Sequence, residues 1–187
     1  HYQHTSYEEQ LQIKSSILKE NLRRIAKVEL AEDLVVHPSP PWNYRNRTRF
    51  RVHSTPRFAI GYYQVGSHKL LPVEQCPISS PLINRALAAL WEMGGSGGME
   101  PSVEEIELFA NADDSQLLME AYCGPSAAPV AGWAERLRGL LPEVAGITVF
   151  PRTGLKEKAI NEVKAVAVSG ASSLSYQARQ HAYRVSA

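Results

Sequence analysis

The sequence predicts an α+β domain with a mainly antiparallel sheet built from hairpins, two packed helices, and a long amphipathic helix at the N-terminus. Two observations lead to this fold class. Apolar and polar residues alternate over several short runs separated by turn residues, which is typical of strands joined in hairpins. Two longer stretches carry apolar residues at helical spacing, which favours helices packed on one face of the sheet.

The bulk composition is that of a folded, water-soluble protein. The chain has 187 residues, which suits one ordinary domain or one domain with an appended element. No apolar run approaches the ~18 residues of a membrane-spanning helix, and no signal-peptide pattern opens the chain. Two cysteines do not make a disulfide framework. We therefore expect a cytoplasmic protein in a reducing setting.

The charges are unevenly distributed along the chain. Residues 1–70 hold 11 Lys and Arg against 6 Asp and Glu, whereas residues 71–187 hold 9 against 13. The basic first third indicates an anionic partner. The alternative is an ordinary solvated surface.

A long helix is predicted over residues 7–28. Ser6 and Glu9 form a capping-box pattern at its start. An apolar stripe follows at helical spacing, so the helix is expected to pack against something. The stripe consists of Leu11, Leu18, Leu22 and Ile25.

A rigid proline-rich stretch, HPSPPWN at residues 37–43, separates this helix from the rest of the chain. Its prolines exclude a helix or a central strand. The expected organisation is therefore an N-terminal helical segment, 1–36, and a domain over 37–187.

The domain is expected to open with a basic hairpin. In residues 44–53 every second residue is an arginine, which places four arginines on one strand face. Residues 57–64 return with alternating apolar side chains, and residues 65–73 add a third short strand. The arginines are Arg45, Arg47, Arg49 and Arg51.

The remaining elements are predicted from caps and periodicity. Ser80 and Pro81 predict the start of a helix over 80–93. Asp113 and Asp114 predict the turn of a second hairpin. The further elements are the hairpin 102–124, a helix over 129–141, and strands over 146–150, 163–168, 173–177 and 181–186.

Four arginines on one face repel one another unless anions lie between or above them. A nucleic-acid backbone is one such anion, because each guanidinium can fork onto phosphate oxygens. Tyr44, Tyr62 and Tyr63 lie nearby in the sequence and could stack on bases. Acids on a neighbouring strand or domain, or plain solvation, are the alternatives.

Cys76 precedes Pro77, between a strand-like run and a helix-like run, where we expect an accessible thiol. A single cysteine can be a packed hydrophobic residue, a nucleophile, or one ligand of a larger site. Cys-Pro is common among iron–sulfur ligands, although the pattern alone favours a structural cysteine. Cys123 is expected to be a packing residue.

Three motifs in this order resemble a known family. They are the basic strand Tyr44–Arg47, the hairpin Gly61–Ser67 and the turn Glu74–Ile78. Together they resemble the central domain of the S-adenosylmethionine-dependent RNA (uracil-5-)-methyltransferases, which make 5-methyluridine in ribosomal and transfer RNA. The resemblance is strongest over residues 42–90 and extends, more loosely, over nearly the whole chain.

The resemblance implies that much of the enzyme lies outside this chain. In cluster-bearing members three cysteines precede the first helix, and Cys76 matches the fourth ligand of a 4Fe-4S cluster. The methyl-donor site, the nucleophilic cysteine and the glutamate base lie after the position that matches Ala187. No catalytic residue is therefore expected here, and the chain alone should be inactive, with neither S-adenosylmethionine nor a cluster stably bound.

The resemblance leaves RNA handling to this chain. Ribosomal RNA is favoured over transfer RNA, because Cys76 points to the cluster-bearing branch. The helical segment 1–36 packs on the catalytic domain in the family, and its exposed stripe could instead pair two copies as a homodimer. The alternatives are a non-catalytic RNA-binding module and a purely structural domain. The expected RNA-contacting residues are Arg45, Arg47, Arg49, Tyr44 and Lys69.

Overall fold

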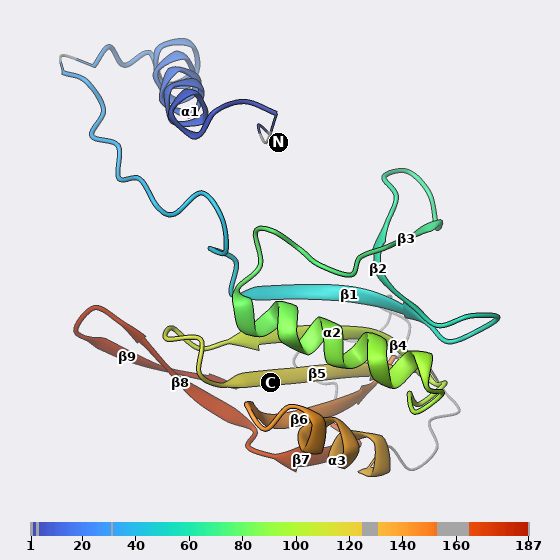
Figure 1. Ribbon diagram of the computed structural model, residues 1–187. Coiled ribbons are helices and arrows are strands. Elements are labelled where there is room, and N and C mark those ends of the chain that lie inside the picture. The colour runs from blue at the N-terminus through green and yellow to red at the C-terminus, as the bar shows by residue number, and fades with distance from the viewer. Residues whose placement is uncertain (1, 3, 31, 125–130, 153–164, 187) are drawn as a thin grey trace. The chain divides into compact units, whose positions relative to one another are not determined.

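A computed structural model describes the chain except for residues 1, 3, 31, 125–130, 153–164 and 187 (Figure 1). The chain divides into two compact units, His1–Pro41 and Trp42–Ala187. Across the described residues, no helix combines the length and the apolar character needed to cross a membrane.

The N-terminal unit contains one helix. Helix α1 (Tyr7–Asn21) continues into a π-helical turn, η1 (Leu22–Ala26), close to the predicted limits of 7–28. The Ser6 hydroxyl accepts a hydrogen bond from the Glu9 N–H at 3.2 Å, which confirms the predicted cap. No residue of α1 or η1 is buried, so the packing of the apolar stripe stays a prediction.

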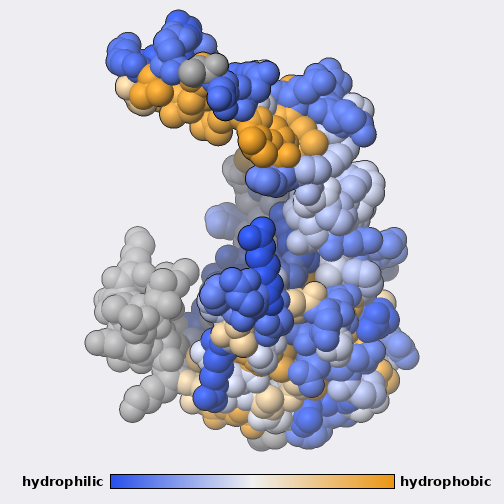
Figure 2. All heavy atoms as spheres, turned by 90° about the vertical axis from the view of Figure 1, so that its left-hand side faces the viewer, coloured by the Kyte–Doolittle hydropathy of each residue, from blue (hydrophilic) through white to orange (hydrophobic). Residues whose placement is uncertain are grey.

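Apolar side chains of this unit are exposed instead. Figure 2 shows them as an orange band on its surface. They are Ile17, Leu18, Ile25, Val28, Leu30, Val35 and Val36.

The second unit is built on a seven-stranded sheet with the strand order β3-β2-β1-β4-β5-β6-β7. All neighbouring strands are antiparallel except β5 and β6, which run parallel. A separate two-stranded ribbon is formed by β8 (Ser173–Ala178) and β9 (His181–Ser186). The sheet strands are β1 (Arg47–His53), β2 (Ala59–Tyr63), β3 (Leu70–Pro72), β4 (Val103–Ala110), β5 (Leu117–Cys123), β6 (Val144–Pro151) and β7 (Ala167–Gly170).

Two helices, α2 (Pro81–Gly95) and α3 (Ala131–Leu140), cover one face of this sheet (Figure 1). The Ser80 hydroxyl accepts from the Ile83 N–H at 3.3 Å and Pro81 opens the helix, as predicted. The core lies between these helices and the sheet. Burying each large apolar side chain there stabilises the folded state by about 1.5–3 kcal/mol. Its largest members include Phe50, Ile60, Leu87, Leu90, Ile106, Met119, Trp133 and Leu137.

The α+β class with a mostly antiparallel sheet is confirmed, with one local difference. The parallel pair β5–β6 needs a long crossover, and α3 lies in that connection. The strand expected over 163–168 is β7, which begins at Ala167; residues 163 and 164 lie outside the described residues, as do 129 and 130 of the expected α3.

In the described part of the chain, no helix lies on the opposite face of the sheet. The β8–β9 ribbon covers part of this face: Leu174 is buried, and the Tyr176 ring lies 5.8 Å from the Phe109 ring. Val185 of the ribbon lines a small cavity together with Leu118 of β5. The rest of the face is occupied by charged side chains of β1, β4 and β5.

Candidate nucleic-acid interface

Strand β1 presents its arginines on the helix-free face of the sheet. Thr48, Phe50 and Val52 are buried on the core side, whereas Arg47 and Arg49 are exposed. This alternation is the one predicted from the sequence. It follows from the two-residue period of a strand with one apolar face.

The neighbouring strand β4 meets these arginines with acids in register. Arg49 lies directly opposite Glu107, and Arg51 lies opposite Glu105. Arg49 Nε donates to Glu107 Oε2 at 2.6 Å, and Arg47 Nε donates to the other oxygen of the same carboxylate. Arg51 Nη1 donates to Glu105 Oε1. Of the alternatives left open by the sequence, pairing with a neighbouring strand therefore holds for these three arginines.

Further charges extend the array on both sides. Arg47 Nη2 lies 3.8 Å from a Glu120 oxygen of β5, and Arg152 Nε lies 3.4 Å from Glu105 Oε1. Arg152 also pairs with Glu104. We call this array the paired face; its members are Arg47, Arg49, Arg51, Arg152, Glu104, Glu105, Glu107 and Glu120.

In the centre of the paired face the acids lie beneath the arginines. The Glu107 side chain is 9% exposed, against 52% for Arg47 and 47% for Arg49. Burial lowers the pKa of Arg49, but the hydrogen bond and charge of Glu107 outweigh burial and raise it overall. The arginines therefore turn outward as cations whose charge is largely balanced from below.

Aromatic rings lie against the arginines of the paired face. The Arg49 guanidinium lies 4.5 Å above the centre of the Tyr122 ring, and Tyr122 stacks on Phe150 with centroids 5.6 Å apart. Burial, and then the hydrogen bond donated to Glu120, raise the pKa of the Tyr122 hydroxyl. Arg51 likewise lies 5.0 Å from the centre of the Tyr63 ring.

The glutamates that pair with these arginines were not among the site residues predicted from the sequence. Glu105 and Glu107 stand two residues apart in β4, so the period of two placed them on one face. Only the strand order shows that this face is the arginine face and that β4 is the neighbour of β1.

Tyr44 and Arg45 belong to a different part of the surface, beside the Cys-Pro turn. The Arg45 N–H donates to the Ile78 carbonyl at 2.7 Å, and the Ser80 N–H donates to the Arg45 carbonyl at 2.8 Å. Tyr44 is about half exposed. Among the residues described, Arg45 makes no ion pair, unlike the arginines of the paired face.

Lys69 lies apart from this segment. It is exposed in the turn between β2 and β3, which projects from the sheet (Figure 1). The Gln64 N–H donates to the Lys69 carbonyl at 2.9 Å and closes the turn. Among the described residues, no hydrogen bond joins Lys69 to Arg45.

Cys76 is buried, with only 7% of its surface exposed, so the expectation of an accessible thiol was wrong. Asn84 of α2 fixes the turn: its side chain accepts from the Cys76 N–H at 2.8 Å and donates to the Cys76 carbonyl at 3.0 Å. Cys123 is fully buried in the core at the end of β5, as predicted.

These residues do not by themselves fit an iron–sulfur cluster. A 4Fe-4S cluster takes four thiolates, and the chain contains two cysteines in separate places. Within the described ranges, no three His, Cys, Asp or Glu side chains are grouped to hold a metal ion.

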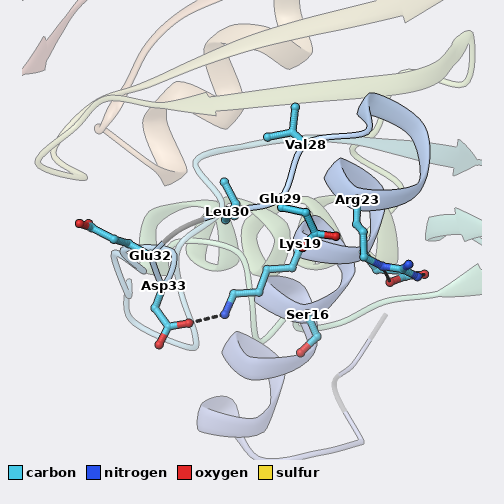
Figure 3. A pocket seen from close by; sticks show the side chains of 9 residues that line it. Ser16, Lys19, Arg23, Val28, Glu29, Leu30, Glu32 and Asp33 are labelled. Carbon is cyan, nitrogen blue, oxygen red and sulfur yellow. Dashed lines mark hydrogen bonds and ion pairs between the residues drawn. The ribbon is translucent and has the colours of Figure 1, made fainter.

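The N-terminal unit has a hollow of about 470 Å³ between α1 and the segment after it (Figure 3). Four of its six charged groups pair with one another: Lys19 binds Asp33, and Arg23 Nη2 lies 2.8 Å from a Glu20 oxygen. Because these charges are satisfied internally and exposed to solvent, the hollow is a weaker candidate than the second unit.

Comparison with known proteins places the chain among RNA methyltransferases. No family model matches it. It is 31% identical over 155 residues to an uncharacterized RNA methyltransferase from Thermosynechococcus vestitus, covering 75% of this chain and 34% of the relative. It is 26% identical over 128 residues to the 23S rRNA (uracil(1939)-C(5))-methyltransferase RlmD of Methylococcus capsulatus, covering 67% of this chain and 29% of the relative.

The fold agrees with a solved structure. The crystal structure of Pyrococcus abyssi tRNA (uracil-54, C5)-methyltransferase in complex with S-adenosyl-L-homocysteine matches 98% of this chain and 44% of its own, with a TM-score of 0.69 and 16% identity. The relatives thus support the RNA methyltransferase family that the motifs predicted, and the solved structure supports the fold. It spans about a third of the length of these two curated relatives.

Proposed function

We propose that the chain is the central, RNA-handling part of a cytoplasmic enzyme that transfers a methyl group from S-adenosylmethionine to C5 of uridine, with 23S ribosomal RNA as the favoured substrate. The motif order carries the proposal. The basic strand, the glycine-containing hairpin and the Cys-Pro turn occur in family order, and relatives with RNA methyltransferase names match 75% and 67% of this chain.

The chain alone is expected to be inactive, because the reaction needs a thiolate that adds to C6 of uracil and a base that removes the C5 proton. Cys76 and Cys123 are both buried, and burial raises the pKa of the Cys123 thiol. A buried, protonated thiol is a poor nucleophile. S-adenosylmethionine supplies the methyl group, and the proposal places its binding site outside this chain.

Within this enzyme, Tyr44 and Arg45 are proposed to contact RNA beside the Cys-Pro turn, with Lys69 reaching it from the β2–β3 turn. Arg47 and Arg49 are proposed to donate to phosphates through the N–H groups that their acids leave unused. Arg45→Ala should reduce the salt dependence of RNA binding by about 0.7–0.9 in log K per log salt. Arg47→Ala should reduce it less, because Glu107 already balances that charge.

Cys76 is proposed to be one ligand of a 4Fe-4S cluster in the intact enzyme, with three cysteines from outside this chain. Asn84 would position it by holding the turn from both sides of the Cys76 peptide. The helical segment 1–36 is proposed to pack its exposed apolar stripe on the catalytic domain, or on a second copy where that domain is missing.

The test is methyl transfer by the full-length protein, purified anaerobically. Incubation with S-adenosylmethionine and unmodified 23S ribosomal RNA should give 5-methyluridine by mass spectrometry, while the 187-residue chain should give none. The Cys76→Ser variant should lose iron and sulfide. RNA binding without methyl transfer would instead identify a non-catalytic RNA-binding module. Iron contents that are equal in both proteins would make Cys76 a packing residue.

A further inference from the structure

We infer that the free end of the β8–β9 ribbon is a second RNA contact, which holds a single-stranded segment through Arg179, Arg184 and Tyr183. The inference rests on the proposed function, since it assigns part of the same RNA to a surface that the family motifs do not include. The family motifs lie between residues 44 and 78, whereas the ribbon begins at Ser173.

The ribbon carries cations without acids. Residues 165–186 contain Arg179, His181 and Arg184, and no Asp or Glu. Arg184 lies opposite Ser175 in the ribbon register, and its Nε donates to the Ser173 hydroxyl at 2.9 Å. Neither arginine makes an ion pair with any residue that the structure describes. Their remaining N–H groups point to no carboxylate and can accept a phosphate.

Exposed aromatic surface lies next to these cations. Tyr176 packs on Phe109 of the sheet, and its cross-strand partner Tyr183 is 54% exposed. The His181 ring lies 6.4 Å from the Tyr183 ring. The free end of the ribbon extends past the end of the sheet (Figure 1).

The same stretch forms a shallow hollow of about 400 Å³, within the range of ordinary ligand sites. Arg184 and Ser175, which are cross-strand partners, line it with a guanidinium and a hydroxyl. Tyr183 also lines it, although its ring belongs with Tyr176 on the other face of the ribbon, because successive residues of a strand point to opposite faces. Single-stranded RNA offers the matching groups, because its bases are free to stack and its phosphates are exposed. A double helix would bury those bases, so an unpaired segment is the expected occupant.

The test is the anisotropy of a labelled, mixed-sequence, single-stranded oligoribonucleotide titrated with the 187-residue chain at several salt concentrations. Arg179→Ala and Arg184→Ala should each lower the steepness of log K against log salt by about 0.7. Tyr183→Ala should weaken binding about fivefold, whereas Tyr183→Phe should bind like the wild type, because its ring still stacks.

Arg136→Ala is the matched control. Arg136 is an exposed cation of α3, on the helix-covered side of the sheet, and its loss removes the same charge without touching the ribbon. If the ribbon variants match Arg136→Ala while Arg45→Ala weakens binding, the ribbon inference is overturned and the proposed function stands. If the wild-type chain binds no RNA at any salt concentration, the RNA-handling role itself fails and the inference fails with it.

Discussion

The paired face and the β8–β9 ribbon both carry arginines on strands, yet their surroundings are opposite. On β1, Arg49 and Arg51 each face a glutamate of β4 in register. On β9, Arg184 faces a serine of β8. The comparison shows that the number of arginines in a strand does not determine how positive its surface is. The cross-strand partner decides, because it is the nearest group that can balance the charge.

This difference predicts that substitutions in the two surfaces have different effects. The buried acids of the paired face need their arginines, since an uncompensated carboxylate in a poorly hydrated place is costly. The ribbon arginines satisfy no buried group, so the folded state does not depend on them. The paired face should therefore respond to substitution mainly through stability, and the ribbon mainly through RNA binding.

The largest expected effect is on the paired face. The double variant Arg47→Ala, Arg49→Ala removes both hydrogen-bonded cations from the Glu107 carboxylate, which is nearly buried. We expect the free energy of unfolding to fall by about 1–3 kcal/mol, because the nearly buried carboxylate loses its half-exposed partners. Urea denaturation would measure this.

A rescue variant separates charge from packing. Adding Glu107→Gln to the double variant removes the carboxylate charge that the deleted arginines no longer balance. The triple variant should recover more than half of the lost free energy of unfolding. If the triple variant is no more stable than the double variant, the loss comes from the alkyl stems of the arginines and not from their charge.

The next effect concerns alkaline pH. Burial and the hydrogen bond to Glu120 raise the pKa of the Tyr122 hydroxyl. In the unfolded chain a tyrosine has a pKa of about 10. Above that pH the unfolded chain has lost the proton, whereas the folded protein still holds it. The stabilisation is complete below pH ~10 and is lost as the pH rises further. Because a single proton is involved, the fall cannot exceed about 1.4 kcal/mol per pH unit, and solvent screening makes it smaller.

The comparison is with Tyr122→Phe. Stability curves between neutral and alkaline pH should decline less steeply for this variant than for the wild type. Parallel curves would show that Tyr122 ionises alike in the folded and unfolded states.

A smaller effect, on RNA binding, is expected when the central acid of the paired face is neutralised. Its arginines then lack a balancing charge, as the arginines of the ribbon do. Glu107→Gln keeps the shape of the side chain but frees the charge of Arg47 and Arg49. We expect RNA binding to tighten, and its salt dependence to steepen by up to about 0.7 per added phosphate contact. Unchanged binding, measured by anisotropy of the same labelled RNA, would indicate that RNA does not reach this face.

The smallest effect is the stability of the ribbon variants. Arg184→Ala removes an exposed cation whose one hydrogen bond goes to a serine hydroxyl. The free energy of unfolding should change by no more than about 0.5 kcal/mol, as for ordinary surface substitutions. A larger loss in urea denaturation would mean that Arg184 supports the ribbon, and would remove the contrast with the paired face.

Local features of the fold could be read from the sequence. The alternation of β1, the Ser6 and Ser80 caps and the burial of Cys123 follow from patterns within a few residues. The parallel pairing of β5 with β6 could not be read in this way, because a short apolar strand carries no mark of its partner's direction.

The candidate site, like the fold, was predictable only where it depends on residues close together in the sequence. The sequence by itself determined that Arg47, Arg49 and Arg51 share one strand face, because a strand has a period of two residues. It also predicted the family, through motifs whose order and spacing are local, and the relatives support that prediction. Only the tertiary structure decided which charges meet, because strand order brings Glu107 from about sixty residues away onto Arg47 and leaves Arg184 facing Ser175.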